Sequence, residues 1–128
     1  MIVLGLLVAG SALVCYFSVS LPASGRIERG GLVGLRTPST KRSDATWLAA
    51  HRAALPLTTG ASGIALFFGT LIALDRPPLD LAPETAALVG LGILLGGLLI
   101  ATVVAERAAR AVAAAGSVTE TDSRPGHP

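Results

Sequence analysis

Three long runs of the 128-residue chain contain no charged side chain, and they constrain its fold more than any other feature. The runs are residues 1–25, 53–74 and 85–105. A helix needs about 20 apolar residues to cross the ~30 Å hydrocarbon core of a bilayer, and each run supplies that length. Charged residues make up 14% of the chain, well below the roughly 25% of soluble domains. The sequence therefore predicts an all-α membrane protein with three transmembrane helices.

The three spans are placed at about residues 2–21, 56–74 and 86–105. Pro22 and Gly25 are expected to end the first span, and Pro56 is tolerated near the first turn of the second. A cleaved signal peptide is the rival interpretation of the first run. No Lys or Arg precedes its apolar core, which favours a retained span.

The third helix is expected to continue past the membrane to about Ala115. This gives one three-span membrane domain over residues 1–115. Residues 116–128 are polar and contain Pro and Gly, so we expect a disordered tail there.

Lys and Arg residues are distributed very unevenly between the loops. None precedes the first span, six lie in the first loop, one lies in the second loop and three follow the last span. The first loop has Arg26, Arg29, Arg36, Lys41, Arg42 and Arg52. The second loop has Arg76, and the residues after the last span include Arg107, Arg110 and Arg124. Basic residues favour the cytoplasmic side. We therefore predict a multi-pass protein of the cell membrane with its N-terminus outside and its C-terminus in the cytoplasm.

The first cytoplasmic loop, residues 26–52, is expected to contain two parts. Residues 26–40 are interpreted as turns because they hold several Gly residues and Pro38. Ser43 can cap a helix that begins at Asp44 and runs to about residue 55. Trp47 favours the headgroup region, so this short helix is predicted to be interfacial and separate from the second span.

Small residues recur every four positions in the second and third spans. Such stripes allow helices to approach closely. They are Ala61, Ala65, Gly69 and Ala73, then Gly97, Ala101, Ala105, Ala109 and Ala113, with Gly92 and Gly96 as a further pair. A homo-oligomer therefore stays among the possible assemblies.

The candidate site residues all lie in the first loop: Gly34, Arg36, Thr37, Pro38, Thr40, Asp44, Trp47, His51 and Arg52. The guanidinium of Arg36 can organise the loop through carbonyls and Asp44, or bind a lipid phosphate. Thr37 and Thr40 are expected to cap the Pro38 turn. His51 is expected to make a loop-to-helix hydrogen bond rather than to act in catalysis.

Other chemistry has little support in the sequence. There is no Cys/His cluster for a metal, no nucleophile arrangement for catalysis and no cofactor motif, and Cys15 lies inside an apolar run. Lys41 and Arg42 are suited to anionic lipid of the bilayer. Direct nucleic-acid binding is not expected.

The order Gly34-Leu35-Arg36-Thr37-Pro38-Ser39-Thr40, followed by Asp44, Trp47 and His51-Arg52, resembles the signature of the SdpI family of small bacterial membrane proteins. The chain departs from that signature where the family has Asn (Gly30), Leu (Lys41) and a Gly after His-Arg (Ala53-Ala54-Leu55-Pro56). The resemblance implies a non-enzymatic protein that gives immunity to a membrane-active antimicrobial peptide. It also implies signalling, in which a cytoplasmic repressor is held at the membrane.

Two other functions remain open from the residues alone. The small-residue stripes are compatible with a small oligomeric transporter or exporter subunit. The basic first loop is compatible with a lipid-binding structural protein of the membrane.

Overall fold

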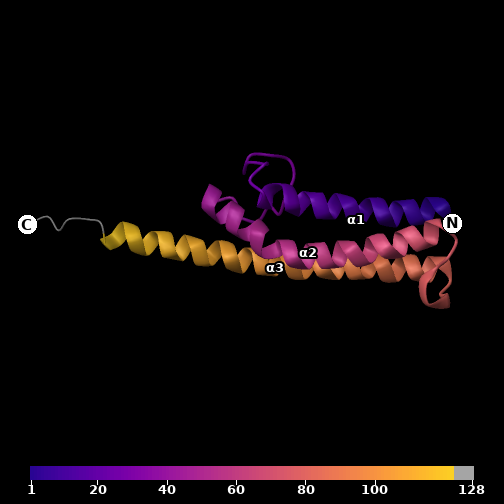
Figure 1. Ribbon diagram of the computed structural model, residues 1–128. Helices are drawn as coiled ribbons and strands as arrows, with labels where there is room; N and C mark the ends of the chain where they lie inside the picture. The colour runs from indigo at the N-terminus through magenta and orange to yellow at the C-terminus, as the bar shows by residue number, and fades with distance from the viewer. Residues whose placement is uncertain (123–128) are drawn as a thin grey trace, which may run out of the picture.

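Helices account for nearly all regular structure in residues 1–122, the part of the chain that the computed structural model describes (Figure 1). The long helices are α1 (Ile2–Ala23), α2 (Asp44–Ala73) and α3 (Pro83–Asp122), and a short 3-10 helix, η1, spans Pro78–Asp80. Each long helix contains a stretch long and apolar enough to cross a membrane. No strand occurs in the described residues. The predicted all-α fold with three membrane-spanning helices is thus confirmed.

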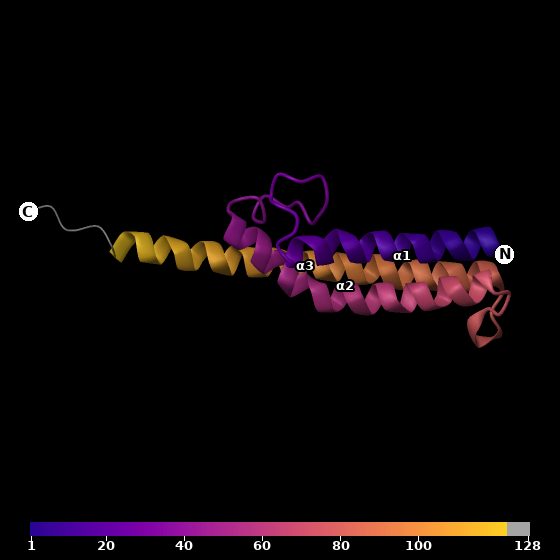
Figure 2. The ribbon, with the colours of Figure 1, turned by 45° about the horizontal axis from the view of Figure 1, so that its top comes forward.

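The helix α2 is the centre of the bundle, because α1 and α3 both pack along it and touch one another little. Successive helices run in opposite directions (Figures 1 and 2). The N-terminus and the η1 loop therefore lie at one end of the bundle. The first loop, defined here as residues 24–43, lies at the other end, where α3 continues beyond the bundle. This alternation places the basic first loop beside the charged part of α3.

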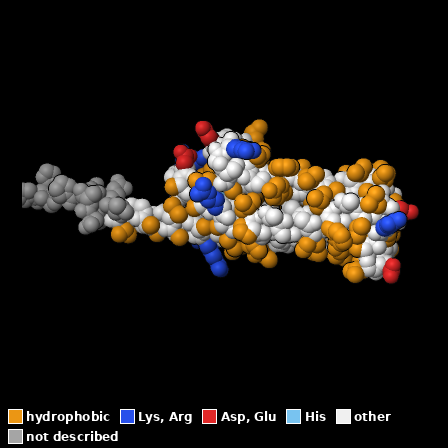
Figure 3. All heavy atoms as spheres, in the orientation of Figure 1, with side chains coloured by type: hydrophobic (Ala, Val, Ile, Leu, Met, Phe, Trp, Pro, Cys, Tyr) orange, Lys and Arg blue, Asp and Glu red, His pale blue; other side chains and the backbone are white. Residues whose placement is uncertain are grey.

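Small side chains bring the helices into close contact. A Cβ added to Gly5 of α1 would lie 2.3 Å from the backbone nitrogen of Ala73, and one added to Gly69 of α2 would lie 2.6 Å from that of Ala9. On the other side of α2, a Cβ at Gly97 would lie 2.3 Å from that of Ala61. Most buried apolar residues are Ala, so the backbones approach closely, as is usual where no hydrophobic effect drives helices together. Apolar side chains instead cover the outside of the bundle (Figure 3).

The predicted interfacial helix does not exist as a separate element. Residues 44–55 form the first turns of α2, which continues through Pro56 without interruption. Proline lacks an N–H and its ring crowds the carbonyl four residues earlier, so it bends a helix that packing keeps together. Figures 1 and 2 show these first turns leaving the bundle axis. Trp47 and His51 lie on these first turns and contact the first loop.

The end of α3 also differs from the sequence prediction. We expected disorder from residue 116, whereas α3 continues as helix to Asp122. The preceding segment, residues 108–115, is rich in Ala, the strongest helix former, and no Pro occurs between residues 84 and 124. Residues 123–128, the rest of the predicted tail, lie outside the described residues.

Candidate functional site

The first loop has no helix or strand of its own, and side chains from α2 and α3 determine its shape. Its C-terminal end leads into a complete helix cap. The Ser43 hydroxyl accepts from the Thr46 N–H at 3.1 Å, and the Thr46 hydroxyl accepts from the Ser43 N–H at 3.0 Å. This reciprocal pair fixes where α2 begins. The residues that contact the loop are therefore held on a defined helical turn.

Trp47 and His51, one turn apart on α2, form a buried surface on which Gly34 lies. Their rings are 4.2 Å apart between centroids, and both side chains are almost fully buried. Gly34 has a φ of +120°, and a Cβ there would lie 2.7 Å from His51 Nε2 and 2.8 Å from Trp47 Cη2. Both the conformation and the space therefore require glycine at this position.

His51 makes the loop-to-helix hydrogen bond that the sequence suggested. The Leu35 N–H donates to His51 Nε2 at 2.8 Å, and His51 Nδ1 lies 2.8 Å from the Trp47 carbonyl oxygen. Because Nε2 accepts, the proton of the neutral ring is on Nδ1, which donates to Trp47. His51 lies just before the uncharged segment 53–74. Burial lowers its pKa, and the hydrogen bond to Trp47 opposes this only in part.

Thr40 organises the turn around Pro38. Its side chain is fully buried, and its hydroxyl accepts from the Thr37 N–H at 3.0 Å. The same hydroxyl lies 2.9 Å from the Leu35 carbonyl oxygen, to which it donates. These contacts close the turn and direct the side chains of Thr37 and Ser39 away from α2, toward α3.

Glu106 on α3 receives both of those side chains. The hydroxyls of Thr37 and Ser39 donate to its two carboxylate oxygens, and Arg110 Nε lies 2.9 Å from Oε1. Glu106 follows directly after the uncharged segment 85–105. Donation from Ser39, then from Thr37, and the nearby Arg110 together lower the pKa of Glu106 to about 2. This carboxylate joins the first loop to the third helix.

Glu106 was not among the site residues predicted from the sequence. It is separated from Thr37 and Ser39 by 69 and 67 residues. The sequence contains only a weak indication that Glu106 contacts the first loop. Glu106 is the first charge after the third span, at the end of the bundle to which the first loop belongs. Ser39 was missed as well, because it occupies a position of the motif that carries no fixed residue.

Arg36 and Asp44 lie on the outer side of the loop. Arg36 is exposed, and its Nη2 donates to the Gly31 carbonyl oxygen at 2.6 Å, as a carbonyl-organising role requires. Asp44 is 86% exposed and pairs instead with Arg29, with Nε and Oδ1 3.4 Å apart. The expected contact of Arg36 with Asp44 is therefore replaced by Arg29–Asp44.

Arg52 connects the two helices that border the loop. Its Nε donates to the Ala23 carbonyl oxygen at 3.3 Å, at the C-terminal end of α1. Such carbonyls have no partner within their own helix, so a cation there is favourable. Pro38, the remaining predicted site residue, is exposed.

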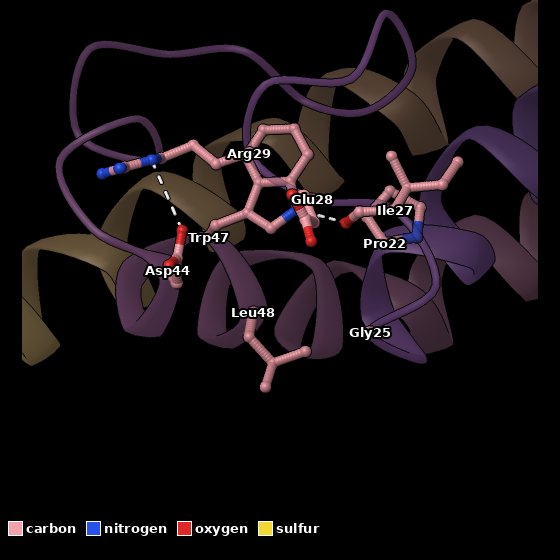
Figure 4. Close-up of a pocket in the computed structure, with 8 residues that line it drawn as sticks. All are labelled: Pro22, Gly25, Ile27, Glu28, Arg29, Asp44, Trp47 and Leu48. Atoms are coloured by element: carbon pink, nitrogen blue, oxygen red, sulfur yellow. Dashed lines mark hydrogen bonds and ion pairs between the residues drawn. The ribbon is translucent and has the colours of Figure 1, made fainter.

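A pocket of about 330 Å³ opens beside Trp47 (Figure 4). Its lining comes from the end of α1, the start of the first loop and the start of α2: Pro22, Gly25, Ile27, Glu28, Arg29, Asp44, Trp47 and Leu48. The Trp47 indole N–H donates to the Ile27 carbonyl oxygen at 3.2 Å, which closes one wall. The described residues contain no group of three His, Cys, Asp or Glu that could hold a metal ion.

The chain was compared with models of known protein families. The model of the SdpI/YfhL protein family matches residues 26–105, which is more than half of the chain. The matched region begins in the first loop and includes Gly34, Thr40, Trp47 and His51. No curated protein and no solved structure matches the chain.

Proposed function

The chain belongs to the SdpI/YfhL protein family, and we propose that it is a non-enzymatic membrane protein that binds a partner at its first loop. Two consequences of binding fit this proposal. The protein gives immunity to a membrane-active peptide, or it signals by holding a cytoplasmic protein, such as a repressor, at the membrane. In both, the helices anchor the protein and the loop presents the recognition surface.

The observation that carries the proposal is the two-sided construction of the first loop. Its inner side is fixed by Trp47 and His51 of α2 and by Glu106 of α3. Its outer side exposes Arg36, and also Lys41 and Arg42. A binding surface whose shape exists before the partner arrives loses less conformational entropy on binding. These exposed cations favour an acidic partner surface.

We propose further that this end of the bundle faces the cytoplasm. The five basic residues of the first loop lie at the same end of the bundle as Arg52 of α2 and Arg107 and Arg110 of α3. Only Arg76 lies in the second loop. The single-cysteine variants Arg42→Cys and Leu79→Cys, each in a Cys15→Ser background, test this in cells. The thiol of Arg42→Cys should react with an impermeant reagent only after permeabilisation, whereas that of Leu79→Cys should react in intact cells. The reverse pattern would contradict the orientation.

The functional test is Arg36→Ala, compared with Arg76→Ala in the second loop as the matched control. Cells that produce the chain are challenged with membrane-active peptides secreted by the source organism, and survival is scored together with the amount of protein in the membrane. Arg36→Ala should abolish protection while the protein stays in the membrane, and Arg76→Ala should retain protection. Full protection by Arg36→Ala would refute loop-mediated binding.

A second candidate function, an oligomeric transporter subunit, is favoured by one observation. Ser62 is 4% exposed, its hydroxyl oxygen has no hydrogen-bond partner, and it lines a groove with Tyr16 and Thr59 between α1 and α2. A polar group without a partner inside a membrane helix can face a solute path formed with another copy. Solute uptake into proteoliposomes that Ser62→Ala abolishes would favour transport over partner binding at the loop.

The remaining alternative is a structural lipid-binding protein that recruits its partners through charge alone. Neutralising Lys41 and Arg42 together separates it from the leading proposal. Charge-driven recruitment should fall with each cation removed and with added salt. Recognition by a shaped loop should instead depend on Arg36 far more than on the other two cations.

A further inference from the structure

The pocket beside Trp47 lies at the end of the uncharged run 1–25, the level at which the headgroups of a bilayer would begin around a helix that spans it. Pro22 and Gly25 in its lining belong to the end of the uncharged run 1–25, and Leu48 lies in the first turns of α2. Trp side chains favour this depth because their rings are apolar and their N–H is polar. A molecule that fills the pocket therefore has an apolar part on the membrane side and a polar part among the charged residues of the loop.

The charges around the pocket differ from those of the rest of this end of the molecule. Arg29 is the one cation among the lining residues, and Glu28 and Asp44 are the two carboxylates, so the lining has a formal net charge of −1. Figure 4 shows all three among the lining residues, with a dashed line joining Arg29 to Asp44. A purely anionic ligand would gain from Arg29 but would be repelled by both carboxylates.

A ligand with one negative and one positive group matches this arrangement. We propose that the pocket binds the phosphoethanolamine headgroup of a membrane lipid, with the phosphate on Arg29 and the ammonium between Glu28 and Asp44. The Arg29–Asp44 pair is exposed and 3.4 Å long, so it is weak and can be exchanged for two pairs with the ligand. The guanidinium of Arg29 is suited to a phosphodiester. This inference does not rest on the partner proposed above.

Two related headgroups fit less well. A choline headgroup has the same charges, but its ammonium has no N–H to donate to Glu28 and Asp44. A glycerol headgroup has no cation at all and leaves both carboxylates unmatched. The volume, about 330 Å³, is at the small end for ligand pockets and suits a compact headgroup. The pocket should thus prefer ethanolamine lipid over choline and glycerol lipids.

Trp47 is the only tryptophan of the chain and lines the pocket, so its fluorescence reports occupancy. The full-length protein in a non-ionic detergent is titrated with dioctanoyl phosphatidylethanolamine, phosphatidylcholine and phosphatidylglycerol. We expect saturable binding with a Kd for the ethanolamine lipid at least roughly tenfold below the other two, the effect of one charge-assisted hydrogen bond. Equal Kd values for the three lipids, or tightest binding of phosphatidylglycerol, would overturn the proposal.

The source of the headgroup is tested with glycerophosphoethanolamine, which has the same polar groups and no acyl chains. Much weaker binding than that of the lipid supports a membrane ligand. Binding as tight as that of the lipid would overturn the lipid assignment.

Variants test the charge argument. Arg29→Gln and Asp44→Asn should each weaken binding of the ethanolamine lipid roughly tenfold. Glu28 is exposed in the loop, so Glu28→Lys should leave the fold intact; it changes the net charge of the lining from −1 to +1 and should shift the preference to phosphatidylglycerol. Asp80→Asn, at the opposite end, is the control and should change nothing. An unchanged lipid preference in Glu28→Lys would refute the assigned role of these charges.

Discussion

At the scale of single residues, Gly34 is the position of the first loop that tolerates substitution least. Its φ of +120° is one that side chains rarely adopt, and the rings of Trp47 and His51 occupy the space of a Cβ. Gly30, four residues earlier, has neither constraint, since no atom lies within 4 Å of a Cβ placed there. The two glycines therefore form a matched pair in the same loop.

Gly34→Ala should detach the loop from α2 at a cost of about 1–3 kcal/mol, which is the usual range for a strained backbone. Trp47 would then become exposed, so its fluorescence emission should move to longer wavelength in the folded protein. Gly30→Ala should leave the emission unchanged. Identical emission from both variants would show that Gly34 does not lie on the Trp47 ring.

The protonation of His51 sets the expected pH dependence of the loop. Its pKa is lowered from 6.5 in the folded state, so folding favours the neutral ring. Its stabilisation is complete above pH 6.5 and is lost progressively as the pH falls below that value. The pKa of Glu106 is lowered from 4.5 to about 2, so its contribution to stability changes only as the pH falls below about 4.5. The first acid-sensitive contact should therefore be the one from Leu35 to His51.

The acid sensitivity of the Leu35–His51 contact is measured by Trp47 fluorescence emission, recorded from neutral to mildly acidic pH. The emission should shift as the pH falls below about 6.5, and His51→Gln, whose amide oxygen can still accept from Leu35, should remove the shift. An unchanged pH profile in His51→Gln would assign the transition to another group.

At the scale of secondary-structure elements, the contact between α1 and α2 depends on two glycines that face each other. Gly5 and Gly69 bring the two backbones so close that a Cβ at Gly69 would lie 2.6 Å from the Ala9 nitrogen and 2.8 Å from the Gly5 carbonyl oxygen. Backbone atoms cannot move aside as a flexible side chain can. The two helices would have to separate to admit a methyl group.

Gly69→Ala should destabilise the bundle by about 1–3 kcal/mol, the usual cost of overpacking. Gly60→Ala on the same helix is the control, because no atom lies within 4 Å of its Cβ position. Thermal unfolding in detergent, followed by circular dichroism, should show a lower Tm for the first variant alone. A Tm for Gly69→Ala equal to that of Gly60→Ala would contradict the close α1–α2 packing.

The sequence predicted the helices well and their boundaries less well. Charge-free runs of membrane-spanning length leave few structural choices, so all three spans were identified. The start of α2 was interpreted as a separate interfacial helix because Trp47 favours the headgroup region and Pro56 was placed near the first turn of the second span. Whether a proline ends a helix or only bends it depends on packing that local sequence does not contain, and here Ala50 and Ala54 pack before it while Thr58 packs after it.

At the scale of the whole molecule, the alternation of the helices brings the first loop and the charged part of α3 to the same end. The Thr-Pro turn was predictable from local residues, and so was a contact between His51 and the loop. The contact with Glu106 was not, because it depends on how two segments almost 70 residues apart meet across α2. A hydroxyl-to-carboxylate contact leaves no periodic pattern that a single sequence could reveal.

The central claim is that the first loop is a folded unit closed by Glu106. Amide hydrogen exchange of the protein in lipid nanodiscs, read by mass spectrometry, tests it most directly. The N–H groups of Leu35, Thr37 and Arg42 are hydrogen-bonded and should be protected. Glu106→Gln should speed exchange across residues 35–42 roughly tenfold or more, since hydrogen bonds to a charged acceptor are lost, whereas Glu84→Gln at the other end should not. Wild-type exchange in this segment as fast as in an unstructured peptide, or unchanged protection in Glu106→Gln, would contradict the account.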